Sequence, residues 1–235
     1  MKQKAILASH GSPTPLGTKM KINKIKSDTL GELQFIKFCT VNEISIKKIT
    51  EKSKRTADFI LSKNSINVIA EVKDVEKNNT TLIYAGEKAG KVVRHKIDSS
   101  YQQIKNECEN LYPGILVIYT NQPSFVSSIT AEDVSAAMFG FHQIVLASNY
   151  KNKIIRKIGE KFGPGRRTTS NHCKSLSAII TLEQTRNNDF INTVYHNPFA
   201  KIPLCLNFFK GQGMYQYTAD KEKIKQELFS SWIAI

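Results

Sequence analysis

The sequence predicts an α/β fold in which helices flank a mixed central sheet. Segments with the helical spacing of apolar residues alternate with short segments rich in β-branched residues. The run at 115–119 (ILVIY) is continuously apolar, which is typical of a strand covered on both faces. With 235 residues, 40% of them hydrophobic, the chain is long enough to bury a full core.

The first half of the chain predicts one helix followed by strands. The helix is expected to begin near Asp28 and to run to about Thr40, because Thr29 and Glu32 have the spacing of a capping box. Residues 43–54 alternate only weakly. Three strands follow, with a turn rich in Asn and Ser at 62–67: 58–61, 68–73 and 80–85.

A second helix is predicted with Asp98 as its N-cap. Tyr101, Ile104, Cys108 and Leu111 would form a single apolar stripe on it, and Pro113 would end it before the strand at 115–119. The remaining expected elements are a helix at 132–139 and strands at 143–147, 177–182 and 190–195.

The domain organisation expected from the sequence is one domain after a short leader. Residues 1–26 contain Gly, Ser and Pro and are predicted to be a flexible leader, and 27–235 to be a single domain. Its core would span about 28–120. Residues 121–235 would elaborate that core with further strands and a basic loop around Gly163-Pro164-Gly165.

The charge balance favours a polyanionic partner. Lys and Arg number 34 against 20 Asp and Glu, a formal net charge of +14. Such a surplus neutralises phosphates, and a Lys-rich genome composition is the alternative explanation. The four cysteines are far apart and form no C-x-x-C pair, which argues against a zinc ribbon or a disulfide framework and suits a reducing cytoplasm. No apolar run approaches the ~20 residues of a membrane span, so no membrane partner is expected.

The stretch 68–73 (VIAEVK) carries two charges inside a predicted strand. Alternation places Val68, Ala70 and Val72 on one face and Glu71 with Lys73 on the other. A hairpin with the preceding strand would bring Asp58 beside Glu71, and two carboxylates suit Mg²⁺ or Mn²⁺, with the lysine beside the ion assisting a water. The alternatives are that Glu71 and Lys73 line a solvated face and that Asp58 is a turn or cap residue.

These motifs resemble a known family. TADF (56–59), AEVK (70–73), the helix containing YQQIK and the run PGILVIY are similar to the core of the PD-(D/E)XK, or restriction-endonuclease-like, nucleases. The resemblance implies an α-β-β-β-α-β core, dependence on Mg²⁺ and hydrolysis of phosphodiester bonds. It implies metal binding by Asp58 and Glu71 and a catalytic role for Lys73. The chain departs from the family pattern at Ala57, where the family has proline.

Three further residues enter the predicted site through this resemblance. Val72 and Glu32 complete the predicted metal-contacting set, and Gln103 is the predicted helix residue beside the catalytic group. Glu32 is explained equally by the capping box. Gln103 lies about 110° around the helix from the apolar stripe, a boundary position, so a solvated side chain is its alternative.

Four basic residues are predicted to contact nucleic acid. Arg94 and Lys96 precede the second predicted helix, and Arg166 with Arg167 follows two glycines in FGPGRR. Glycines allow close approach of a backbone to phosphate, and arginine donates in a fork that matches it. A solvent-exposed basic loop is the alternative.

The leading hypothesis is therefore a metal-dependent nuclease that acts on DNA rather than RNA. The first alternative is a catalytically inactive, nuclease-like module that binds nucleic acid. The second is a structural or interaction protein whose basic charge is compositional. A homodimer is compatible with each of them.

Overall fold

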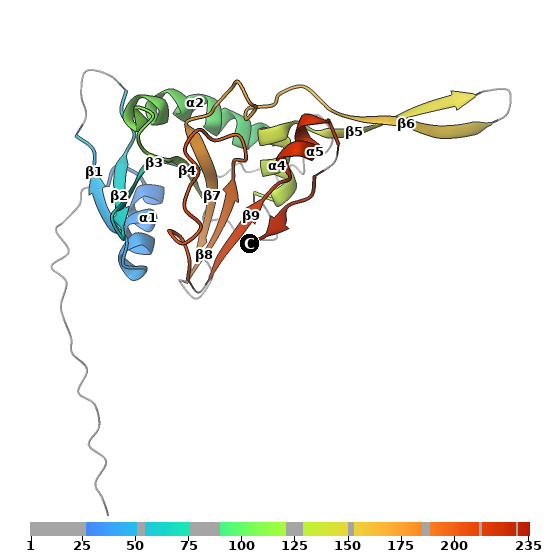
Figure 1. Ribbon diagram of the computed structural model, residues 1–235. Coiled ribbons are helices and arrows are strands. Elements are labelled where there is room, and N and C mark those ends of the chain that lie inside the picture. Colours follow the sequence, from blue (N-terminus) through green and yellow to red (C-terminus); the bar gives the residue numbers. More distant parts are fainter. Residues whose placement is uncertain are drawn as a thin grey trace, which may run out of the picture.

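A computed structural model describes residues 27–50, 55–75, 90–120, 129–149, 153–184, 189–211, 213–228 and 230–235. The expected leader at 1–26 and the expected strand at 80–85 lie outside these ranges. Eight strands form one mixed sheet in the order β1-β2-β3-β4-β7-β8-β9-β10, and β5 pairs with β6 in a separate two-stranded sheet (Figure 1). The elements are α1 (Leu30–Val41), β1 (Ser45–Lys48), β2 (Phe59–Lys63), β3 (Ile66–Asp74), α2 (Lys91–Cys108), β4 (Gly114–Thr120), α4 (Ala131–Phe139), β5 (His142–Asn149), β6 (Ile154–Phe162), β7 (Leu176–Gln184), β8 (Phe190–His196), β9 (Met214–Thr218), α5 (Lys221–Lys225) and β10 (Ile233–Ala234).

Helices cover both faces of the large sheet, which confirms the predicted α/β class. α1 packs on one face, where Phe35 and Phe38 join a buried cluster with Phe59 of β2 and Val117 of β4. α2 and α4 pack on the other face, in a second cluster that contains Ile97, Val134, Ile69 and Leu116. Because each strand alternates its side chains, β3 and β4 contribute to both clusters.

The strands that carry the candidate site form an antiparallel meander, β1-β2-β3. Asn64 and Ser65 both have positive φ (50° and 63°) and connect β2 to β3 as a two-residue turn. The expected six-residue turn at 62–67 is therefore too long, because its flanking residues pair with each other in the sheet. Strand β1 lies within the segment whose alternation is weak, and it pairs with β2.

The apolar run in β4 is a strand buried along its whole length, as predicted. It lies parallel to β3 on one side and to β7 on the other. The part of the chain predicted to be an elaboration therefore continues the same sheet as the predicted core. The helix and strands expected at 132–139, 143–147, 177–182 and 190–195 correspond to α4, β5, β7 and β8.

The start of the second helix differs from the prediction. α2 begins at Lys91, and Asp98 lies in its second turn instead of capping it. The reason is that Val93 and Ile97 extend the buried stripe of Ile104 and Cys108 towards the N-terminus. Leu111 lies beyond the helix and is 67% exposed.

Two further expectations concern cysteines and membranes. Cys39, Cys108, Cys173 and Cys205 are free. None of the helices in the described ranges is long and apolar enough to cross a membrane.

Candidate active site

Glu71 is a carboxylate buried in the middle of β3. Its side chain is 0% exposed, and it shares a face of the strand with Ile69 and Lys73, on the side of the sheet covered by α2. The opposite face, with Val68, is also buried. The expectation of a Glu-Lys face left open to solvent is wrong for Glu71, because neighbouring strands and a helix enclose it. The solvated-strand alternative therefore does not explain this residue.

Asp58 lies beside Glu71, as the predicted hairpin requires. It immediately precedes β2, and its backbone N–H donates to the Ala70 carbonyl oxygen at 3.1 Å. Its Oδ2 accepts a hydrogen bond of 2.8 Å from the backbone N–H of Val72. This bond holds the Asp58 carboxylate against the backbone just after Glu71, fourteen residues away in sequence, and not within its own turn.

The two carboxyl groups share an environment that disfavours negative charge. Burial and, to a smaller extent, the negative charge of Asp58 raise the pKa of Glu71 to about 7, although Lys73 opposes the shift. Burial also raises the pKa of Asp58, against the effect of the Val72 N–H. The pair consequently carries less than its full negative charge near neutral pH unless another cation approaches.

Lys73 supplies one positive charge directly at this pair. Its Nζ lies 2.6 Å from Oε1 of Glu71, and its side chain is 28% exposed. The side chain of Asp58 also interacts with the Glu71 carboxyl group, both through its charge and through a hydrogen bond. A buried carboxylate is costly unless such partners or a cation compensate its charge.

The donor set around Glu71 fits a hard divalent cation. Asp58 and Glu71 offer carboxylate oxygens, and Val72 could contribute only its backbone carbonyl. Mg²⁺ commonly uses one or two carboxylates and keeps several waters. No three Asp, Glu, His or Cys side chains in the described ranges come together as a group that could hold a metal ion. Among the described residues, Asp58 and Glu71 are therefore not joined by a third such side chain.

Glu32 is the carboxylate that does not join the pair. It lies on α1, whose apolar residues cover the face of the sheet opposite to Glu71, but its negative charge still acts on Asp58 and raises the pKa of that carboxyl group. Its Oε2 accepts hydrogen bonds from the backbone N–H of Asp28 and from Nζ of Lys48, both at 2.9 Å. Half of the expected capping box is present, since Thr29 Oγ1 accepts a hydrogen bond from the Glu32 N–H at 3.2 Å. The carboxylate closes on the amide of Asp28, one residue earlier than a capping box requires.

Lys48 is a charged residue near the site that the sequence prediction missed. It pairs with Asp28 and Glu32, and its charge also acts on Asp58. The antiparallel register sets Lys48 opposite Phe59, the residue after Asp58. The weak alternation of residues 43–54 indicated a strand, but it did not predict the pairing with β2 that brings Lys48 near Asp58.

Asp74 is the second residue that was missed, and it ties α1 to the end of β3. Its carboxylate accepts hydrogen bonds from the Gly31 N–H at 3.0 Å and from Thr29 Oγ1 at 3.1 Å. A Cβ on Gly31 would lie 2.0 Å from Oδ1 of Asp74, so the close approach needs glycine. Asp74, which directly follows Lys73, thus satisfies the free N–H of Gly31 at the start of α1.

Gln103 of α2 is a positioning residue in this structure. Its Nε2 donates to the carbonyl oxygen of Thr56 at 3.0 Å, two residues before Asp58. The neighbouring Gln102 is exposed and donates to Asn106 on the same helix. Gln103 is therefore the glutamine directed towards the segment that precedes Asp58, and its catalytic role stays a prediction.

The predicted phosphate contacts lie elsewhere, where α2 meets the loop after β6. Arg167 forms a bidentate ion pair with Asp98, and Arg166 pairs with Glu227 at 2.8 Å. Arg94 donates to the Ala136 carbonyl oxygen at 3.2 Å, and burial lowers its pKa. Lys96 is half-buried on the same helix. Internal carboxylates and carbonyls already satisfy the arginines, so nucleic acid would have to displace those contacts.

Comparison with protein-family models, with curated proteins and with solved structures gave no match to this chain.

Proposed function

We propose that the protein is a metal-dependent nuclease that hydrolyses phosphodiester bonds, with DNA as its substrate and the cytoplasm as its location. The observation that carries the proposal is the buried Glu71 carboxylate, which has Asp58 beside it and Lys73 at 2.6 Å. Burying such a cluster costs free energy that an apolar residue at position 71 would avoid. Perturbed carboxylates beside a lysine are typical of functional sites.

The order of elements also supports the proposal. From α1 to β4 the described residues run helix, three strands, helix, strand. The third and fourth of these strands, β3 and β4, are parallel, and the first three form a meander. This agrees with the α-β-β-β-α-β order that the resemblance to PD-(D/E)XK nucleases implies, with β1 as the first strand.

Each side chain then has a distinct part in hydrolysis. A divalent ion, when bound, would supply Lewis-acid activation of a water and of the phosphoryl group. Asp58 and Glu71 would hold it, with the Val72 carbonyl as a further ligand. Lys73 orients the attacking water and balances the negative charge that develops on the phosphoryl oxygens. Water forms the new P–O bond, and the bond to the leaving sugar oxygen breaks.

The direct test is cleavage of plasmid, linear and single-stranded DNA, and of RNA, with Mg²⁺ or Mn²⁺. Glu71→Gln and Lys73→Met should each lower the rate by about 100-fold or more. Glu183→Gln is the matched control, because Glu183 is a half-buried carboxylate on β7 whose pKa is likewise raised by burial. If Glu71→Gln and Lys73→Met cleave as fast as wild type, the proposed site is wrong.

A nuclease-like module that binds nucleic acid without cutting it is the second candidate. The ion pair between Lys73 and Glu71 favours it, because the lysine already occupies one carboxylate oxygen. Salt-sensitive DNA binding without any effect of Mg²⁺ on the protein would select this candidate over the enzyme.

A further inference from the structure

The two-stranded sheet of β5 and β6 projects away from the body of the protein (Figure 1). We call the described part of this hairpin, 142–149 and 153–162, the ribbon. Its strands pair only with each other. An isolated two-stranded ribbon is marginally stable in water, so a long projecting one indicates a binding partner.

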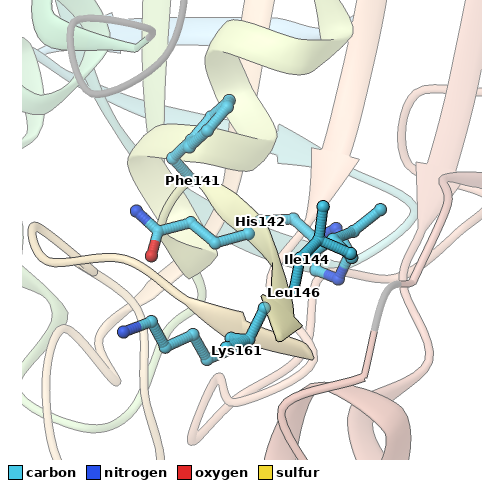
Figure 2. A pocket seen from close by; sticks show the side chains of 7 residues that line it. Phe141, His142, Ile144, Leu146 and Lys161 are labelled. Atoms are coloured by element: carbon cyan, nitrogen blue, oxygen red, sulfur yellow. The ribbon is translucent and has the colours of Figure 1, made fainter. Parts of the chain in front are cut away.

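The register sorts the ribbon's side chains onto two faces. Residues paired across the strands share a face, which sets Lys161 with Gln143 and Arg156 with Ala147 on one side. On the other side lie Ile144, Leu146 and Ile155, of which the least exposed is 58% exposed. In Figure 2, Lys161 and Ile144 extend to different sides of the ribbon, around an open hollow of about 640 Å³ lined by 141–146 and Lys161.

The ribbon carries an excess of positive charge. Its basic residues are Lys153, Arg156, Lys157 and Lys161, and its acidic residue is Glu160. Lys157 and His142 both pair with Glu160, on the aliphatic face. Lys153, Arg156 and Lys161 form no ion pair with any described residue, in contrast to Arg166 and Arg167 just beyond the ribbon.

We propose that the ribbon is a nucleic-acid-binding arm that lies in a groove of a DNA duplex. Arg156 and Lys161 would contact phosphates. Ile154, which the register sets on their side, and Ile155, on the aliphatic side, would contact sugars and base edges. A two-stranded ribbon fits a DNA groove, and arms of this kind combine basic side chains with apolar wedges. One duplex would accommodate both the unpaired cations and the exposed aliphatic side chains, whereas a protein partner on the aliphatic face would leave the cations without a role.

This inference rests on the proposed function, because it names the part of the chain that would grip the substrate of the site. It also gives a role to the positive charges of the ribbon, which lie outside that site. The arginines first predicted to bind phosphate are held by internal carboxylates, and the ribbon's cations are the alternative that the structure offers.

The test is binding of a 30-base-pair duplex without divalent metal, measured by fluorescence anisotropy at several salt concentrations. The double variant Arg156→Gln/Lys161→Gln should reduce the slope of log affinity against log salt by about 1.8. That slope corresponds to roughly 60-fold weaker binding at 0.1 M salt. Lys201→Gln/Lys210→Gln, which removes two exposed lysines outside the ribbon, is the matched control and should change neither value by as much.

A second variant tests the aliphatic side chains. Ile154→Ser/Ile155→Ser should weaken duplex binding while leaving the salt slope unchanged. If both ribbon variants bind DNA like wild type, or if wild type binds no duplex, the inference is overturned. It is also overturned if Ile154→Ser/Ile155→Ser converts a dimer into a monomer in sedimentation and leaves DNA binding intact, because the ribbon would then join two copies of the chain.

The same variants separate this inference from the proposed function. If wild type cleaves nothing but the basic ribbon variant loses affinity, the arm stands and the nuclease fails. If Glu71→Gln abolishes cleavage while both ribbon variants bind and cleave like wild type, the nuclease stands and the arm fails.

Discussion

Glu71 and Lys73 lie two residues apart on the same face of β3, with Oε1 and Nζ separated by 2.6 Å, yet only the lysine reaches solvent. The Glu71 carboxylate is therefore held inside the protein, and the positively charged Lys73 lies between it and solvent. This arrangement makes the protonation of Glu71 sensitive to whatever other cation is present.

The stability of the metal-free protein should fall as pH rises from about 4.5 to about 7. Burial raises the pKa of folded Glu71 to about 7 from its ordinary value of 4.5, so the folded state binds more protons than the unfolded state between these values. The stabilising effect of protonation is complete below the lower value and is lost above the upper one. Glu71→Gln should therefore raise the melting temperature at pH 8 and have little effect at pH 4.

Thermal melts with a chelator across this pH range measure the effect. Glu43→Gln, at an exposed position, is the control and should give no pH-dependent difference. Equal gains for Glu71→Gln at both ends of the range would contradict the assignment of the raised pKa to Glu71.

Divalent metal should stabilise the wild-type protein more at pH 8 than at pH 6. A metal ion binds the ionised carboxylates, so the proton on Glu71 competes with it. Binding to the folded state alone raises the melting temperature with metal concentration. Mn²⁺ titration followed by calorimetry should show this for wild type and not for Glu71→Gln. A metal-induced shift that is the same in both proteins would place the ion elsewhere.

Lys48→Met should destabilise the protein by about 1–3 kcal/mol, because it removes a hydrogen-bond donor from a buried carboxylate. The side chain of Glu32 is 7% exposed, and Lys48 is one of its two described partners. Lys47→Met is the matched control, since Lys47 is the exposed neighbour on the same strand. Urea unfolding compares the two, and equal losses would mean that the contact with Glu32 contributes nothing.

Asp98 and Arg167 should show a coupling free energy of about 0.5–1 kcal/mol in a double-mutant cycle. Their ion pair is bidentate but partly exposed, which limits its strength. Asp98→Asn, Arg167→Gln and the double variant, unfolded in urea, give the value. Asp98→Asn should also increase DNA affinity by freeing a guanidinium. If affinity is unchanged, the loop after β6 does not face the nucleic acid.

Local patterns allowed much of the fold and part of the site to be predicted. The run at 115–119 specified a strand buried on both faces because no polar residue interrupts it. Asp58, Glu71 and Lys73 could be grouped because alternation and one hairpin decide their proximity. The start of α2 was misplaced because charged residues at 94–96 conceal the stripe of Val93 and Ile97.

The remaining differences arise from long-range packing. That Glu32 lies across the sheet from Glu71 depends on which face α1 covers, which spacing along the chain does not determine. That Arg166 and Arg167 are paired depends on residues some 60 or more positions away. The ribbon could not be inferred as a projecting arm, since only Phe162 at its base joins a core cluster and burial does not set the pattern of its other residues.

The position of β4 between two parallel neighbours limits how the chain can be divided. A fragment ending at residue 120 would retain the candidate site but lose β7, leaving β4 as an edge strand that is apolar on both faces. Such edges recruit other chains by strand pairing, so this fragment should aggregate instead of folding. Proteolysis or recombination within 121–175 should therefore make the first part of the chain insoluble, without touching any residue of the candidate site.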